Sequence, residues 1–123
     1  PDCIRDILLY VEDTSNFDIY TNYDSSNIPD ELSEYTHDEI VYHIRQCQMS
    51  DLITKVSYYD CGSKISIKDL TPRGHEFLAN IESDSLWNTT KEISGKIGSR
   101  SLQALIQIAT GVITATINKQ LGI

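Results

Sequence analysis

The stretch between Thr36 and Ile81 constrains the fold of this chain most, because it predicts a helix, a hairpin and a second helix in direct succession. Thr36 and Glu39 have the spacing of a capping box, in which the threonine hydroxyl accepts from the Glu39 amide and the glutamate reaches back. The helix that begins there is expected to run to about Ser50. One face of it is expected to be buried, with the side chains Ile40, Val41, Ile44 and Cys47.

A β-hairpin is expected after this helix. The β-branched and aromatic residues from Lys55 to Tyr59 indicate a first strand, and residues 64–70 alternate apolar and polar side chains as a second strand does. The sequence Asp-Cys-Gly-Ser at 60–63 has the composition of a turn. These features predict two antiparallel strands joined by a short turn.

The second helix of the stretch is expected to be capped by Thr71, with Pro72 at its first position. A glycine inside a helix costs about 1 kcal/mol relative to alanine. Gly74 therefore indicates that this helix passes close to a strand. The buried face of the helix is expected to consist of Phe77, Leu78 and Ile81.

The flanking segments predict further elements. An apolar stripe with helical spacing predicts a helix over about 2–12, made of Ile4, Ile7, Leu8 and Val11. The polar segment 12–35 is expected to be mostly loop, with a helical turn at 29–33. A short strand is expected in this loop at Phe17, Ile19 and Tyr20.

Two helices are expected at the C-terminal end. The first is expected to present one apolar face beside Trp87, made of Leu86, Thr90, Ile93 and Ile97. Gly98 and Ser99 are expected to end it. A last helix, from Leu102 to about Ile117, is apolar on more than one side.

This order of elements predicts the α+β class, with a winged-helix-like domain over 1–82 and a two-helix C-terminal extension over 83–123. The expected order in the domain is helix, short strand, helix, β-hairpin wing and helix. The helix capped by Thr36 takes the place of a recognition helix, and residues 60–64 form the tip of the wing. The first helix of the usual helix-turn-helix pair must then be very short.

Charge and cysteine content bear on partners and location. Residues 1–82 hold sixteen acids and six bases, so a phosphate backbone is repelled by much of this surface, and DNA is disfavoured as a partner. Three cysteines without a CxxC pair suit a reducing compartment, so a cytoplasmic protein is expected. No signal peptide is recognised and no segment has the roughly 20 apolar residues of a membrane span, so no membrane association is expected.

The chain also resembles a known family. The residues that carry the resemblance lie at 1–9, 42–44, 87–88, 108–114 and, most specifically, in the Gly-His-Glu-Phe-Leu block at Gly74–Leu78. They are similar to a family of small proteins from Gram-positive bacteria and their phages, described as a domain of unknown function. The resemblance implies a winged-helix-like fold and frequent residence in prophages or other mobile elements. It implies no established activity.

Two groups of residues invite a chemical interpretation. His43 and Cys47 lie one helical turn apart, but a zinc site needs three or four ligands and no second pair completes it. His75 and Glu76 could be an acid–base pair, yet their place in the first turns of a helix favours a structural role. We therefore expect no catalytic residue, no metal and no cofactor, and no enzymatic activity.

Two surfaces are candidates for binding. The outward face of the helix capped by Thr36, together with the wing, could contact nucleic acid through Tyr42, His43, Arg45, Gln46, Met49 and Lys64. The last helix is a candidate for dimerisation, because a helix that is apolar nearly all round is buried or paired. Its candidate residues are Leu102, Leu105, Ile106, Ile108, Ala109, Val112, Ile113 and Ile117.

The sequence supports two functional hypotheses. The first is a non-enzymatic interaction module, associated with a prophage or mobile element, that binds a protein partner through its acidic face or its C-terminal helices, or forms a homodimer. The second is a winged-helix DNA-binding transcriptional regulator that uses the same helix and the lysines of the wing.

Overall fold

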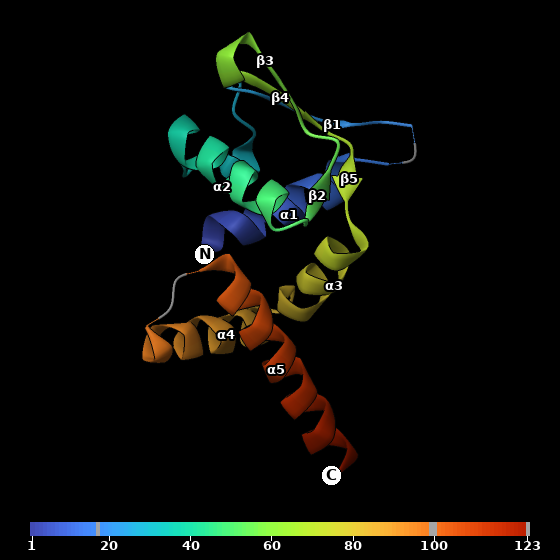
Figure 1. Ribbon diagram of the computed structural model, residues 1–123, viewed down its shortest axis with the longest axis vertical. Helices are drawn as coiled ribbons and strands as arrows, with labels where there is room; N and C mark the ends of the chain where they lie inside the picture. Colours follow the sequence, from blue (N-terminus) through green and yellow to red (C-terminus); the bar gives the residue numbers. More distant parts are fainter. Residues whose placement is uncertain (17, 99–100, 123) are drawn as a thin grey trace. The chain divides into compact units, whose positions relative to one another are not determined.

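A computed structural model of the chain describes residues 1–16, 18–98 and 101–122. The chain divides into two compact units, Pro1–His75 and Glu76–Ile123. The division falls inside helix α3 (Pro72–Ile81), whereas the boundary expected from the sequence, after residue 82, falls between α3 and α4 (Asp84–Ile97). The class is α+β, as predicted, with helices and small antiparallel sheets (Figure 1).

The helices of the first unit pack against one another through the apolar face of the first helix. Helix α1 (Asp2–Thr14) packs against α2 (His37–Met49) and against the short 3-10 helix η1 (Asp30–Leu32). The predicted face of α1 is confirmed, since these side chains are buried: Ile4, Ile7, Leu8 and Val11. The helical turn expected at 29–33 is also confirmed, as η1.

A three-stranded antiparallel sheet, in the order β1-β4-β3, lies beside these helices (Figure 1). Its strands are β1 (Thr21–Asp24), β3 (Ser57–Tyr59) and β4 (Lys64–Ile67). The 3-10 helix η2 (Asp60–Gly62) joins β3 to β4, so the predicted hairpin and turn are confirmed. The central strand β4 therefore pairs with one neighbour that precedes it directly and with another from far earlier in the chain.

The strand expected over residues 55–59 is shorter than predicted. Lys55 has a positive φ of 53°, a conformation that is uncommon for residues other than glycine and that breaks the strand. Before it, β2 (Ile53–Thr54) pairs instead with β5 (Asp69–Leu70) in a separate two-stranded sheet. The kink thus divides one long ribbon into two short ones.

The strand expected at Ile19 and Tyr20 is wrong in position. Both residues are exposed, and the strand is β1, which begins at Thr21, where side chains turn inward. The amides of Asp18 and Ile19 donate to Asn16 Oδ1, each at 2.9 Å, so the side chain of Asn16 holds this segment in a turn. Phe17, also expected in the strand, lies outside the described residues.

Helix α2 begins and ends close to the predicted residues. Its capping box is present, with Glu39 N–H donating to Thr36 Oγ1 at 3.2 Å and Thr36 N–H donating to Glu39 Oε1 at 3.0 Å. The side chains of Ile40, Ile44 and Cys47 are buried as expected. The burial predicted for Val41 is wrong, because this side chain is partly exposed at the edge of that face.

The second unit contains the end of α3, α4 and α5 (Leu102–Leu121), and α4 packs against α5. The predicted face of α3 is confirmed by the burial of Phe77, Leu78 and Ile81. The predicted face of α4 is confirmed in part: Thr90 and the neighbouring Trp87 are buried, and Leu86 and Ile93 are partly exposed. Ile97 is wrong as a member of this face, because it is 63% exposed. Gly98, with φ 79°, ends α4 as expected, and Ser99 lies outside the described residues.

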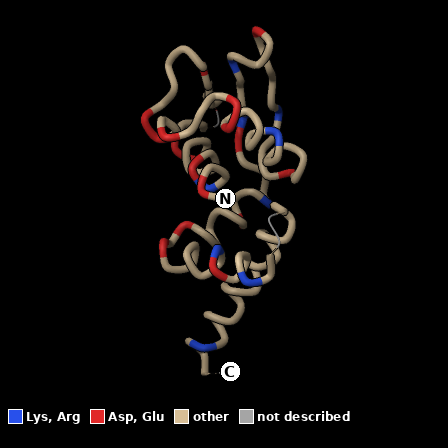
Figure 2. The backbone as a smooth tube through the Cα atoms, turned by 90° about the vertical axis from the view of Figure 1, so that its left-hand side faces the viewer, with Lys and Arg blue, Asp and Glu red and all other residues tan. Residues whose placement is uncertain are grey.

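The two units differ sharply in charge. Residues 1–75 hold fourteen acids and six bases, which accounts for the whole net charge of -8, and residues 76–123 hold four of each. Within the first unit, residues 24–39 carry six acids and no base, whereas residues 45–73 carry five bases and three acids. Figure 2 shows that the tail of α5, near the C-terminus, carries no red segment. Acidity is therefore a property of the first unit, and chiefly of its N-terminal half.

Candidate functional site

The outward face of α2 presents an uncovered row of large side chains. Tyr42, Arg45 and Met49 follow one another at intervals of three and four residues, so they lie on one side of the helix. Tyr42 is 58% exposed and Met49 is 72% exposed. Gln46 is half-buried beside them. Four of the six residues of the predicted recognition face thus lie in one row.

Strand β3 completes this surface from the side. The Arg45 guanidinium lies 5.5 Å from the centroid of the Tyr58 ring, a cation–π distance. The Tyr58 hydroxyl donates to Gln48 Oε1 at 2.8 Å. Partial burial raises the pKa of Tyr58, and the nearby Arg45 offsets part of that rise. Tyr58 therefore fixes two side chains of α2, and helix and wing form one surface.

Sequence reasoning missed Gln48 and Tyr58. The alternation of side chains along a strand could have placed Tyr58 and Tyr59 on opposite faces. Nothing in the local sequence indicates that Tyr58 meets Arg45, because ten or more residues separate β3 from the contacting part of α2. This contact depends on how the hairpin folds back onto the helix.

Lys64, the sixth predicted residue, lies at the start of β4. Its ammonium group is 3.8 Å from Asp60 Oδ2, and both side chains are largely exposed, so the pair contributes little stability. Asp60 and Cys61 have positive φ values of 51° and 58°, which produce the tight tip of the wing. The wing thus extends its lysine into solvent on a constrained turn.

The side chains of His43 and Cys47 lie in different surroundings. His43 Nδ1 lies 2.7 Å from the Glu39 carbonyl oxygen of its own helix, and Cys47 faces the core. Burial raises the pKa of the Cys47 thiol to about 12, which disfavours the thiolate that binds metals. No group of three His, Cys, Asp or Glu residues is placed to hold a metal ion within the described part of the chain.

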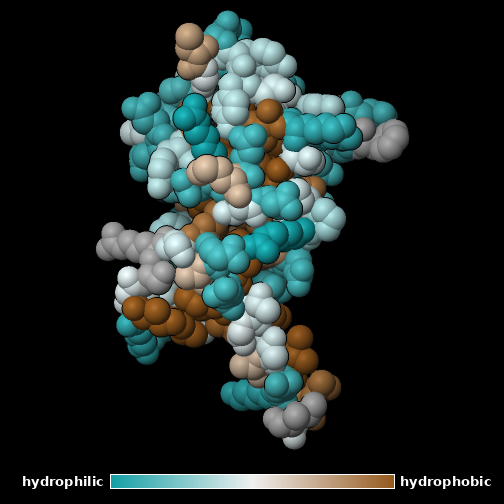
Figure 3. All heavy atoms as spheres, in the orientation of Figure 1, coloured by the Kyte–Doolittle hydropathy of each residue, from teal (hydrophilic) through white to brown (hydrophobic). Residues whose placement is uncertain are grey.

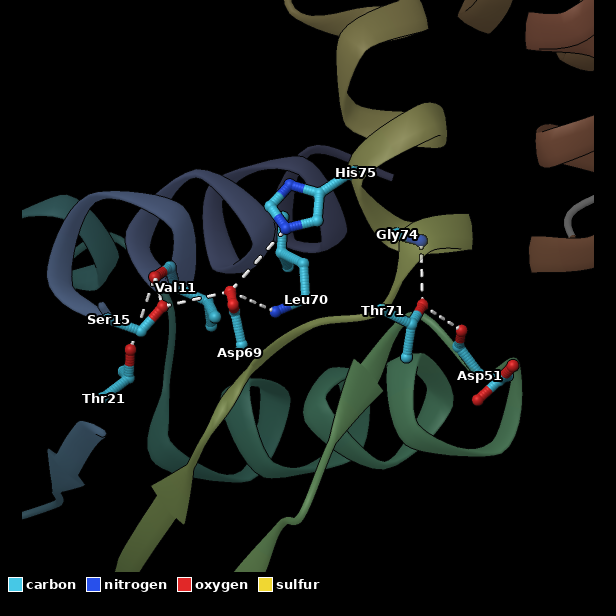
Figure 4. Close-up of polar contacts among 9 residues, drawn as sticks. All are labelled: Val11, Ser15, Thr21, Asp51, Asp69, Leu70, Thr71, Gly74 and His75. Atoms are coloured by element: carbon cyan, nitrogen blue, oxygen red, sulfur yellow. Dashed lines mark hydrogen bonds and ion pairs between the residues drawn. The ribbon is translucent and has the colours of Figure 1, made fainter. Parts of the chain in front are cut away.

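His75 takes part in a polar cluster that joins α1, β5 and α3 (Figure 4). Its Nε2 lies 3.8 Å from Asp69 Oδ1, which also accepts from the Leu70 amide at 2.7 Å. Ser15 Oγ lies 3.3 Å from the same Asp69 oxygen and 2.7 Å from the Val11 carbonyl. In a hydrolytic triad the histidine lies between hydroxyl and carboxylate; here the carboxylate lies between the other two.

Thr71 and Gly74 fix the start of α3 in the same view. The Gly74 amide donates to Thr71 Oγ1 at 2.9 Å, and that hydroxyl donates to the Asp51 carbonyl (Figure 4). The predicted cap is confirmed. Glu76, the proposed partner of His75 in acid–base work, is exposed. The cluster therefore holds elements together, in line with the structural role expected for it.

The predicted dimer helix is covered over part of its length. Leu105 and Ala109 of α5 are buried, and Ile117 is 50% exposed. The remaining predicted residues are partly exposed: Leu102, Ile106, Ile108, Val112 and Ile113. No helix of the described residues is both long enough and apolar enough to cross a membrane.

Comparison with known proteins gives the family of the chain. Residues 1–100 match the family described as "Hypothetical protein (DUF2513)". An "Uncharacterized protein" of Haemophilus influenzae is 32% identical over 115 residues, which cover 92% of each chain. No solved structure matches the chain. The chain is thus an α+β protein of unknown function, as the resemblance implied, and it belongs to the DUF2513 family.

Proposed function

We propose that this chain is a winged-helix-like interaction module without enzymatic activity, and that it binds a protein partner through the outward face of α2. The exposed row of Tyr42, Arg45 and Met49 carries this proposal. Aromatic residues, methionine and arginine are enriched in protein interfaces, and tyrosine and arginine are common among the residues that dominate binding energy. The element order and the sheet order β1-β4-β3 support the winged-helix description.

The contact between Arg45 and Tyr58 strengthens the proposal. A long side chain that is already held in place loses less conformational freedom when a partner binds. The acidic segment 24–39 runs into the first turn of α2, so a partner with basic residues around an apolar centre fits this side of the unit. An apolar contact rimmed by opposite charges is an ordinary arrangement for a protein complex.

Capture of partners in the native host tests the proposal. Cross-linking followed by mass spectrometry is expected to recover a defined partner with the unmodified chain. Met49→Glu is expected to weaken its binding by about tenfold or more, because a charge replaces the most exposed apolar side chain of the row. Ile19→Glu is the matched control, since Ile19 is also a large exposed apolar residue, at 55%, and lies on the loop before β1. Equal recovery by both variants contradicts the proposal.

Duplex DNA is the second candidate for the same face. The separation of charge favours it: the segment from Arg45 to Arg73 carries more bases than acids, although the unit as a whole is acidic. Lys64 at the wing and Arg45 on α2 are placed on the two elements that a winged helix applies to DNA. On this hypothesis the chain is a transcriptional regulator.

Salt-dependent binding to a random-sequence duplex distinguishes the two candidates. If DNA is bound, Lys64→Ala is expected to reduce the slope of log affinity against log salt by about 1. Lys96→Ala is a matched control, because Lys96 is likewise exposed and paired one turn away, with Glu92 at 3.2 Å. An affinity at low salt no better than that of an equally acidic control protein rejects the regulator.

We further propose that the chain acts in the cytoplasm and is encoded on a prophage or another mobile element. The resemblance of the Gly74–Leu78 block and the three cysteines without a CxxC pair support this proposal. Genomic neighbourhood tests it. Lysogeny or defence genes beside the coding sequence are expected, and a fixed neighbourhood of housekeeping genes contradicts the proposal.

A further inference from the structure

The C-terminal half of α5 leaves a row of aliphatic side chains uncovered. Among the described residues after Ala109 none is buried, although this half contains Val112, Ile113, Ile117 and Leu121. Ile117 is 50% exposed and Leu121 is 66% exposed. Figure 1 shows α5 extending past α4, and Figure 3 shows hydrophobic side chains at the surface of this region. The apolar face that packs on α4 therefore continues beyond it.

Three threonines in this half of α5 bond their hydroxyl groups to the helix backbone. The hydroxyls of Thr110, Thr114 and Thr116 each donate to the carbonyl oxygen four residues earlier, at 3.0, 2.9 and 2.8 Å. A threonine whose hydroxyl is bonded to its own helix has less need of water there and presents its methyl group. Lys119 is the single charged residue of α5.

Charge indicates what can cover this face. The first unit carries the whole net charge of -8, so two copies of the chain repel each other wherever their first units approach. The second unit carries four acids and four bases and is neutral. The face on α5 has neither the acidic nor the basic rim that would select an oppositely charged partner. It is, however, self-complementary, since it is apolar and uncharged on both copies.

The spacing of the side chains suits a helix pair. Ile113, Ile117 and Leu121 recur every four residues, so they form one ridge along the helix, with Val112 beside it. Ridges of this kind interlock when two helices cross, and a two-fold axis brings the same ridge of each copy together.

We propose that the chain forms a homodimer in which the Ile113–Ile117–Leu121 ridges of two copies of α5 pack against each other. The ridge spans roughly 12–15 Å of helix. The contact is therefore small compared with a standard interface of about 800 Å² per partner, and a dissociation constant in the micromolar range is expected. This surface is distinct from the α2 face, so the dimer does not depend on the function proposed above.

The mass of the full chain in solution tests the dimer. Sedimentation velocity or light scattering across the micromolar range is expected to show a concentration-dependent shift from one chain to two. Ile117→Glu is expected to raise the dissociation constant of the dimer by about tenfold or more, because two like charges would meet in an apolar contact. Higher salt is expected to favour the dimer by screening repulsion between the acidic first units.

Asn118→Glu is the matched control, since it adds the same charge one residue away on the polar side of α5. Both variants place an acid near the same helix end, so an effect on the helix dipole is common to them. Unchanged helicity by circular dichroism separates loss of pairing from loss of the helix, and Leu121→Glu repeats the test at a more exposed site. A wild-type chain that stays monomeric, or equal effects of Ile117→Glu and Asn118→Glu, overturns the dimer. A different protein that copurifies with a monomeric chain would assign the ridge to that partner instead.

Discussion

Gly74 lies in the first turn of α3, where the helix passes the backbone of Leu52. A Cβ added at this position would collide with the Leu52 carbonyl oxygen, which already accepts from the Thr71 amide at 3.0 Å. The close approach inferred from a glycine inside a helix is therefore confirmed. The residue is required by space, because its backbone is helical and adopts no conformation special to glycine.

Gly74→Ala is expected to lower the free energy of unfolding by about 2 kcal/mol or more, since backbone atoms must move to admit the methyl group. Thermal or urea unfolding measures this change. Gly95→Ala provides the control: Gly95 lies inside α4 with open space around it, so alanine is expected to stabilise the helix by about 0.5–1 kcal/mol. The same sign of change in both variants would contradict the steric explanation.

At the scale of the element, the start of α2 is determined by a local signal at its N-cap residue, Thr36. The capping box pairs two amides that would otherwise lack partners at the helix start. Its hydrogen bonds lower the pKa of Glu39, because they favour the charged carboxylate. Because α2 carries the candidate binding face, the cap also determines where that face begins.

Thr36→Ala is expected to reduce the stability of the chain by about 1 kcal/mol, through loss of the acceptor for the Glu39 amide. Chemical denaturation gives the value. Thr89→Ala serves as the comparison, since the Thr89 hydroxyl donates to the Ser85 carbonyl of its own helix at 3.0 Å and α4 gains from alanine. A loss at Thr89 as large as that at Thr36 would show that capping is not the cause.

At the scale of the whole molecule, burial of ionisable groups sets the dependence of stability on pH. Burial raises the pKa of both Cys3 and Cys47 from 9.0 to about 12. Burial, with the hydrogen bond that Tyr35 donates to Asp6 at 2.6 Å, raises the pKa of Tyr35 above its ordinary 10.0. In each case the unfolded chain loses its proton at lower pH than the folded chain, so stability present below pH 9 is lost as pH rises.

The free energy of unfolding is thus expected to fall between about pH 9 and 12, by up to roughly 1.4 kcal/mol per pH unit for each thiol that ionises on unfolding. Urea unfolding at a series of pH values measures the slope. Cys47→Ala is expected to make the slope shallower, whereas Cys61→Ala is expected to leave it nearly unchanged, because Cys61 is exposed. A slope that is the same in the wild type and in Cys47→Ala would refute the link to buried thiols.

The sequence determined the beginnings of the helices and most of their buried faces by itself. Thr36 with Glu39, Thr71 with Pro72 and the stripe of α1 are signals between near neighbours, where hydrogen bonds and helical spacing act within a few residues. The positions of α2 and α3 follow from them. The sequence could not decide the interruption at Lys55, because its positive φ arises where the two ribbons separate.

Only the tertiary structure decided which segments meet. The pairing of β1 with β4 joins residues forty or more positions apart, and it places the strand at Thr21 instead of at the more apolar Ile19 and Tyr20. The contact of Tyr58 with Arg45 and Gln48, which organises the candidate face, depends on the same folding of the hairpin. Local chemistry specifies helix ends and turns, whereas strand register and the neighbours of a surface residue are set by packing between distant parts of the chain.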